Sequence, residues 1–167
     1  MPKTEENLKA AFAGESQANR RYSSFAEKAD QEGFKQVAKL FKAAAFAEAL
    51  HAKRHLVMLK GVKSTAENML AAIEGEGYEN REMYPGFGKD AAADGNKAAA
   101  VNFQQTGKVE KVHEELFKAA LKAVQEGRKI EEKPYFVCGI CGNTVEGEPP
   151  ETCPICGASK SMFKRVD

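Results

Sequence analysis

The chain has 167 residues and a formal net charge of +1, so it is one domain, or one domain with a small appendage. A charge this close to zero gives no overall field that favours nucleic acid or an anionic membrane. No apolar run approaches the roughly 20 residues that span a bilayer, and the first residues lack the charged-then-apolar pattern of a secretion signal. We therefore expect a cytoplasmic protein whose four cysteines are not paired in disulfides.

Four long helices are predicted in the first three quarters of the chain, because apolar residues recur at the 3.6-residue period and glycines stand where each pattern stops. Thr4 is the expected N-cap of the first helix, which ends at Gly33. Ser64 and Glu67 form a capping box for the third helix, in which Pro85 predicts a kink. The other expected helices span residues 34–60, 64–94 and 97–126.

Two Glu-x-x-His pairs lie in the second and fourth expected helices: Glu48 with His51, and Glu110 with His113. Residues at i and i+3 share a helix face, so each pair can point at one metal ion. Two such pairs, with carboxylates from two further helices, are typical of dimetal sites in four-helix bundles. The pairs use two of the three histidines in the chain. The third, His55, is interpreted as a structural group or as a support for the ligands.

The further carboxylates are expected from the first and third helices. Glu15 lies on the apolar stripe of the first helix, and Glu76 and Glu79 continue the stripe of the third. A single glutamate in a helix is usually solvated, but the pattern across four helices reverses that expectation. Carboxylate and imidazole ligands suit iron or manganese better than a closed structural zinc site. The candidate metal ligands, which are also the candidate catalytic residues, are Glu15, Glu48, His51, Glu76, Glu79, Glu110 and His113.

The composition changes after Gly127. Residues 128–134 are polar and charged and end in proline, so we expect a linker between a helical domain of residues 1–127 and a second domain of residues 135–167. Two Cys-x-x-Cys-Gly knuckles separated by eleven residues indicate a tetrahedral thiolate site for iron or zinc. A tail this short needs such a metal in order to fold. The four expected ligands are Cys138, Cys141, Cys153 and Cys156.

Taken together, these motifs resemble the rubrerythrin family, and the resemblance covers the whole chain. It implies a mainly α fold: a ferritin-like four-helix bundle followed by a small rubredoxin-like, metal-bound β domain. The implied cofactors are two iron ions in a carboxylate-bridged di-iron site and one iron ion in the four-cysteine site. The matching segments are AGESQ at residues 13–17, AEALHAK at 47–53, GEGYENREMYP at 75–85, EKVH at 110–113, and the two cysteine knuckles.

The resemblance also implies a role for each ligand. Glu48 and Glu110 bridge the two irons, and one iron exchanges His51 in the reduced state for Glu79 in the oxidised state. This exchange is chemically reasonable, because ferric iron prefers an additional anionic oxygen and ferrous iron tolerates a neutral imidazole. The remaining implied roles belong to Glu15 on the first iron, to Glu76 and His113 on the second, and to Tyr22 and Tyr84, which match tyrosines that hydrogen-bond the ligating carboxylates.

The activity implied by the resemblance is a peroxidase that reduces hydrogen peroxide to water in oxidative-stress defence. Electrons would arrive singly through the thiolate-bound iron, from rubredoxin or from an NAD(P)H-dependent reductase. The chain itself has no nucleotide-binding motif, because Gly75-Glu-Gly77 lies in an expected helix with no strand before it. Three alternatives stay open: a dioxygen-reducing oxidase, a ferroxidase or iron-storage protein, and a non-catalytic zinc-ribbon adaptor, which leaves the buried carboxylates unexplained.

The connection between the second and third helices is shorter than in the best-known members of this family. These helices run parallel in a ferritin-like bundle, so the chain must travel back by on the order of 30 Å. Residues 61–64 reach roughly 14 Å when extended. We therefore predict a domain-swapped homodimer, in which the ligands on the first two helices of one chain meet those on the last two helices of its partner. The alternative is a third helix that starts later, after an extended crossover.

Overall fold

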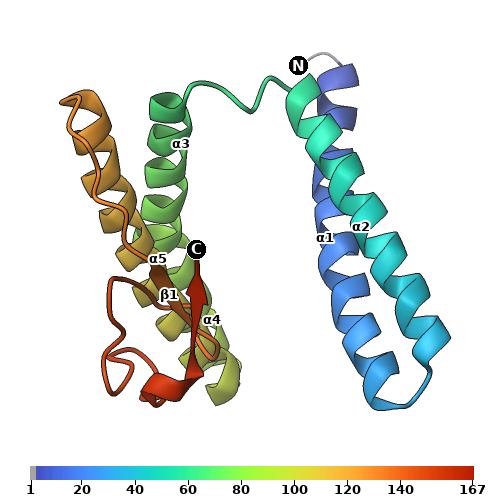
Figure 1. Ribbon diagram of the computed structural model, residues 1–167. Helices are drawn as coiled ribbons and strands as arrows, with labels where there is room; N and C mark the ends of the chain where they lie inside the picture. Colours follow the sequence, from blue (N-terminus) through green and yellow to red (C-terminus); the bar gives the residue numbers. More distant parts are fainter. Residues whose placement is uncertain (1–2) are drawn as a thin grey trace. The chain divides into compact units, whose positions relative to one another are not determined.

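The computed structural model describes residues 3–167 and consists of two compact units, one ending at Lys63 and the other spanning Ser64–Asp167 (Figure 1). None of the described helices combines the length and apolar character that a membrane span requires. The helical elements are α1 (Lys3–Gln31), α2 (Lys35–Met58), α3 (Thr65–Tyr78), the π-helical turn η1 (Glu79–Met83), α4 (Tyr84–Ala93), α5 (Lys97–Gln125) and the 3-10 turn η2 (Lys160–Met162). The strands are β1 (Tyr135–Cys138), β2 (Thr144–Glu146) and β3 (Phe163–Val166).

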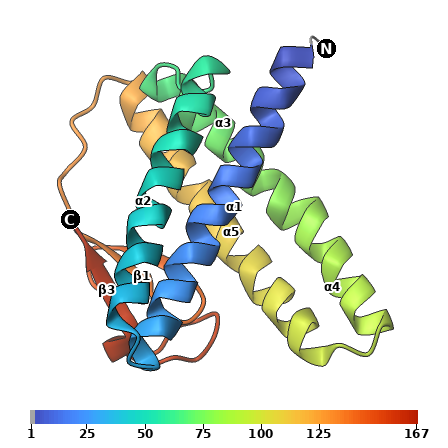
Figure 2. The ribbon, with the colours of Figure 1, turned by 90° about the vertical axis from the view of Figure 1, so that its right-hand side faces the viewer.

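The first unit is a hairpin in which α1 and α2 run antiparallel, side by side in both views (Figures 1 and 2). Gly33 makes the predicted stop, with a φ of 84° that only glycine adopts at little cost. Alanines such as Ala26 and Ala38, each 1% exposed, are buried where the helices meet, which lets the two backbones approach closely. Thr4 lies inside α1, so its prediction as the N-cap is wrong, because the helix already includes Lys3.

The second unit opens with the predicted capping box. The hydroxyl of Ser64 accepts the N–H of Glu67, and the Glu67 carboxylate accepts the N–H of Ser64 at 3.2 Å. Because α3 begins directly after Ser64, the alternative of a late-starting third helix is wrong. The hydrogen bonds that close α2 extend through Lys60, which has a φ of 54°, to Gly61. The connection between the two helices is therefore no longer than Gly61–Ser64, which is the length that the sequence predicts.

The third expected helix is interrupted just before Pro85. Residues Glu79–Met83 form the π-helical turn η1, whose closing bond runs from the N–H of Tyr84 to the carbonyl of Glu79. Pro85 lies in the first turn of α4, where its missing N–H costs little. In place of the kink expected at Pro85, the helix is interrupted by a π-helical turn that starts six residues before the proline. Both α3 and α4 pack along α5.

The C-terminal strands form a small antiparallel sheet in the order β2-β1-β3. Its core consists of Cys138, Cys153 and Phe163, so the buried interior is built largely from candidate metal ligands. Within the second unit this domain packs on α5 through β2. Val109 of α5 is 2% exposed, and its Cγ1 lies 3.8 Å from the point where a Cβ on Gly142 would stand. The contact places the domain against the helix that carries Glu110 and His113.

Candidate metal centres

The first group of ligands lies on the hairpin of α1 and α2. Glu15, Glu48 and His51 have ligand atoms that all lie within 4.8 Å of one another, and we call them the N-terminal triad. Nδ1 of His51 lies 2.9 Å from Oε2 of Glu48, which is the meeting of side chains that the i, i+3 spacing predicts. The side chain of His51 is 50% exposed, so the hairpin alone covers only one side of the triad.

The second group lies between α3 and α5. Glu76, Glu110 and His113 also have ligand atoms within 4.8 Å of one another, and we call them the C-terminal triad. Nδ1 of His113 lies 2.9 Å from Oε2 of Glu110 and 3.8 Å from Oε2 of Glu76. Burial, followed by the neighbouring Glu110, raises the pKa of Glu76. Two carboxylates gathered in this way repel one another, and a cation between them removes the repulsion.

The two triads have the same composition, two carboxylates and one imidazole each. Oxygen and imidazole donors with room for further ligands suit iron or manganese. Six of the seven predicted helical ligands therefore gather into two groups that could each hold a metal ion, one on each unit.

Glu79, the seventh predicted ligand, is in neither triad. It is the first residue of η1, and burial, followed by the charge on Glu76, raises its pKa. Burial, followed by the charges of Glu79, Glu110 and Glu76, likewise raises the pKa of Tyr84. The hydrogen-bonding role expected of Tyr84 stays a prediction.

Two supporting residues were predicted on the hairpin. The ring of Tyr22 lies 6.3 Å from the ring of Phe25 and 6.0 Å from that of Phe41, within an aromatic cluster. Nδ1 of His55 is buried and has no hydrogen-bond partner among the residues that the structure describes. Neither residue is in the N-terminal triad. Their supporting roles stay predictions.

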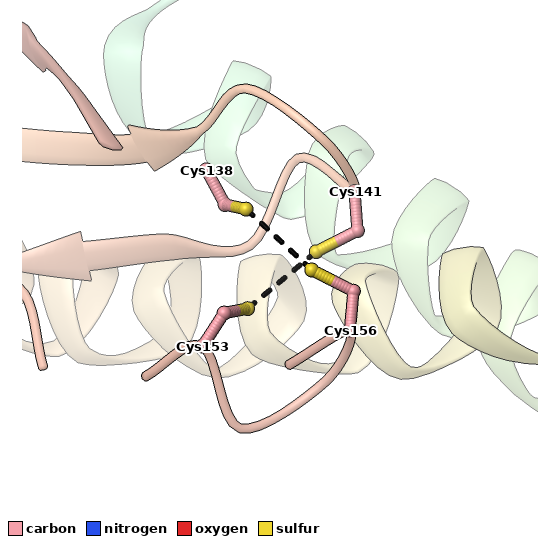
Figure 3. A group of neighbouring side chains, drawn as sticks. All are labelled: Cys138, Cys141, Cys153 and Cys156. Carbon is pink, nitrogen blue, oxygen red and sulfur yellow. Dashed lines mark hydrogen bonds between the residues drawn. The ribbon is translucent and has the colours of Figure 1, made fainter. Parts of the chain in front are cut away.

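The four cysteines converge from two loops, and their sulfur atoms all lie within 4.8 Å of one another (Figure 3). Sγ of Cys138 lies 3.7 Å from Sγ of Cys156, and Sγ of Cys141 lies 3.7 Å from Sγ of Cys153. These distances are far beyond the ~2 Å of a disulfide bond, and all four cysteines are free. Four convergent thiols are a donor set for one tetrahedral metal ion. We call this group the four-cysteine centre.

Each knuckle closes through its glycine. Gly142 and Gly157 have φ values of 85° and 77°, and each donates its N–H to the carbonyl of the first cysteine of its knuckle at 2.9 Å. Burial opposes ionisation of Cys153, but backbone N–H groups in its own knuckle outweigh burial and lower its pKa to about 7. Burial raises the pKa of Cys141 and of Cys156. The positive charge of a bound metal ion overcomes that cost and holds all four as thiolates.

Thr144 joins the four-cysteine centre to the C-terminal triad. Its hydroxyl donates to the carbonyl of Gly142 at 3.1 Å and lies 3.0 Å from Nε2 of His113. A hydroxyl has one proton, so with that proton given to Gly142 its oxygen accepts the Nε2–H of His113. Nδ1 of His113 then turns a lone pair toward Glu110 and Glu76, an arrangement that a metal cation completes. Nothing in the sequence marked Thr144, because its role depends on the packing of the tail on α5.

Two carboxylate–imidazole triads on long helices, followed by a four-thiolate β domain, define a ferritin-like di-iron protein with a rubredoxin-like domain. Residues 6–121 match the rubrerythrin family, and residues 136–164 match the rubredoxin-like domain of rubrerythrin. The chain belongs to the rubrerythrin family.

Several relatives resemble the chain over almost its full length. A putative rubrerythrin of Methanocaldococcus jannaschii is 39% identical, covering 98% of this chain and 93% of the relative. A rubrerythrin of Porphyromonas gingivalis is 38% identical, covering 97% of this chain and 89% of the relative. A solved structure of nigerythrin in a partially reduced state aligns with a TM-score of 0.60 and 33% identity, covering 99% of this chain and 88% of that one.

Family membership gives the cofactors, a di-iron site and a rubredoxin-type iron site, and both donor sets in this chain fit them. It also makes the chain an oxidative-stress protein of the oxidoreductase class, with a rubredoxin-like centre for electron-transfer chemistry.

Proposed function

We propose that this protein is a non-haem di-iron peroxidase that reduces hydrogen peroxide to water with electrons delivered through the four-cysteine centre. Each peroxide takes up two electrons and two protons and gives two waters. The observation that carries the proposal is the hydrogen bond between Thr144 and His113, because it joins a triad ligand to the small β domain that carries the four cysteines. An iron-storage protein has no need of such a connection, and a zinc-ribbon adaptor has no use for the triads.

We assign the seven helical residues as the ligands that would hold one dimetal site, in which Glu48 and Glu110 would each supply a carboxylate to both halves. When bound, a pair of ferrous ions supplies two electrons to one peroxide, which avoids release of a hydroxyl radical. Glu79 stands outside the C-terminal triad, on a turn of its own, and this separation supports its role as the ligand that alternates with His51. The terminal ligands are Glu15, Glu76 and His113, and Tyr84 and Tyr22 hold ligating carboxylates in place.

The electron donor is a separate protein, rubredoxin or an NAD(P)H-dependent reductase, since residues 75–77 lie inside α3 and no nucleotide motif accompanies them. We place the protein in the cytoplasm, which is supported by four free thiols that a reducing compartment preserves.

An anaerobic assay tests this function against its rivals. Iron-loaded protein, with NAD(P)H and a rubredoxin reductase, should oxidise NAD(P)H when peroxide is added, at two electrons per peroxide. A dioxygen-reducing oxidase would instead turn over faster in a parallel assay in which air-saturated buffer replaces the anaerobic buffer and peroxide. A ferroxidase or storage protein would oxidise added ferrous iron far beyond the metal content of its own sites. Metal analysis of the anaerobically purified protein accompanies the assay and establishes that iron, rather than zinc, fills both sites.

Replacing Glu79 with alanine should slow peroxide turnover by about tenfold or more while leaving most of the bound metal in place. The two triads keep six ligands, which is why binding survives, but the oxidised site loses its additional carboxylate. Glu82→Ala, in the same π turn but exposed, is the matched control and should turn over normally. Steady-state peroxide consumption and metal analysis provide the readout. Unchanged turnover in the Glu79 variant would rule out the exchange.

A further inference from the structure

Glu114 of α5 is a buried carboxylate that the proposed reaction does not use. Among the residues that the structure describes, it is the one charged side chain in the buried core, at 4% exposed. Asn80 and Arg81 donate to its two oxygens, each at 2.7 Å, and Nζ of Lys118 lies 3.0 Å away. A carboxylate this deeply buried persists only with such partners. Two of the three lie in η1, so these bonds tie the π turn to α5.

The π turn determines the face of the helix on which Tyr84 lies. In an uninterrupted α-helix, Tyr84 would stand about 140° around the axis from Glu79, because each residue advances by about 100°. A π turn contains one additional residue, so Tyr84 occupies the place of a residue at i+4 and lies about 40° from Glu79. The register of η1 therefore places Tyr84 on the same face of the helix as Glu79.

Two glycines show that this arrangement is closely fitted. A Cβ on Gly77 would overlap the guanidinium group of Arg81, so glycine at this position leaves room for Arg81 to reach Glu114. A Cβ on Gly107 of α5 would stand 3.1 Å from Cβ of Tyr84, so the side chain of Tyr84 in this register sits directly against the backbone of α5. At each glycine, the space that a Cβ would take is occupied by a side chain at or next to η1.

We propose that Glu114 is a positioning residue that, through Asn80 and Arg81, holds η1 in its π register and so keeps Tyr84 beside Glu79. Isolated π turns are rare because their hydrogen bonds compete with those of a regular α-helix, and a charged anchor on the neighbouring helix offsets that disadvantage. The assignment of Glu79 and Tyr84 to the dimetal site rests on the proposed function, whereas the register of the turn is a property of the chain alone.

The test compares Glu114→Gln with Glu115→Gln in the full-length, metal-loaded protein. Glu115 is the adjacent glutamate, 60% exposed, and also pairs with Lys118, so its variant controls for the loss of a charge on α5. Hydrogen–deuterium exchange is measured at residues 79–84, with the amide of Val109 in the core of α5 as the reference. In Glu114→Gln, amides of η1 should exchange about tenfold or more faster relative to that reference, or a crystal structure should show Tyr84 displaced from Gly107. Glu115→Gln should show neither change.

Gly77→Ala is a second test of whether the Arg81–Glu114 pair holds η1. The added methyl displaces the Arg81 side chain without altering α5. It should reproduce the effect of Arg81→Gln, and combining the two should add little. If η1 exchanges as in the wild type and Tyr84 stays against Gly107 in both Glu114→Gln and Gly77→Ala, Glu114 does not hold the turn. Since neither readout is an activity, an absence of peroxide turnover in the wild type would refute the proposed function and leave this result standing.

Discussion

Replacing Cys138 with serine should abolish peroxide turnover that is supported by NAD(P)H and a reductase. Cys138 is 1% exposed and contributes both a sulfur to the four-cysteine centre and a side chain to the core of the small β domain. Serine removes the thiolate, and its buried hydroxyl has no partner that replaces a metal ion. Cys156→Ser should have the same effect, since it removes another sulfur from the same group.

The dimetal site itself should survive this change. Protein that has been reduced chemically beforehand should still consume about one equivalent of peroxide, because the two triads lie on helices that do not include the knuckles. Ile140→Ser is the matched control: it is in the same knuckle, but its side chain is 61% exposed and turnover should be normal. Normal turnover of Cys138→Ser with reductase would mean that electrons do not pass through the four-cysteine centre.

The sequence predicted the helices well because their ends depend on local chemistry. Gly33, Gly95 and Gly127 all adopt the positive φ expected of helix stops, and Ser64 caps α3 as its spacing to Glu67 requires. At the end of α2, however, the positive φ falls on Lys60, one residue before the expected glycine. A helix end is therefore predictable to about one residue, because neighbouring positions can share the same closing bonds.

The π turn was not predicted, and the reason is periodicity. One additional residue rotates the following helix by about 100°, which in sequence resembles the disturbance expected from a nearby proline. The turn depends on Glu114, which lies in another helix, and no local pattern marks that carboxylate as buried. Thr144 was not predicted either, because its role also depends on an element distant in the sequence. Its contact with His113 exists only because the β domain packs on α5.

The triads were predictable because a Glu and a His three residues apart meet on any regular helix. This spacing alone brought His51 to Glu48 and His113 to Glu110, both at 2.9 Å. The third member of each triad required the packing of a second helix, which the apolar stripes indicated. Whether the two triads belong to one dimetal site is a question of assembly, and our prediction depends on the length of one connection.

We predict that the protein forms a domain-swapped homodimer in which each dimetal site combines the N-terminal triad of one chain with the C-terminal triad of its partner. Ten residues lead from His51 to Gly61, and eleven lead from Thr65 to Glu76, so the return along parallel helices is on the order of 30 Å. The connection Gly61–Ser64 extends to roughly 14 Å. Large apolar side chains on both units stay exposed, as expected of surfaces that a second chain covers: Phe25, Val37, Leu40, Phe46 and Leu50 in the first, and Leu70, Tyr78 and Val101 in the second.

Complementation between two inactive variants tests whether each dimetal site draws its ligands from two chains. Glu48→Ala damages the N-terminal triad and Glu110→Ala the C-terminal triad, so neither homodimer should turn over peroxide. In a purified swapped heterodimer of the two, one site receives both defects and the other receives none, so about half of the wild-type activity should return. Pairing Glu48→Ala with Glu15→Ala is the matched control and should restore nothing, because both changes fall in the N-terminal triad. No recovery in the first heterodimer, or a monomer in solution that keeps both irons, would show that one chain supplies the whole site.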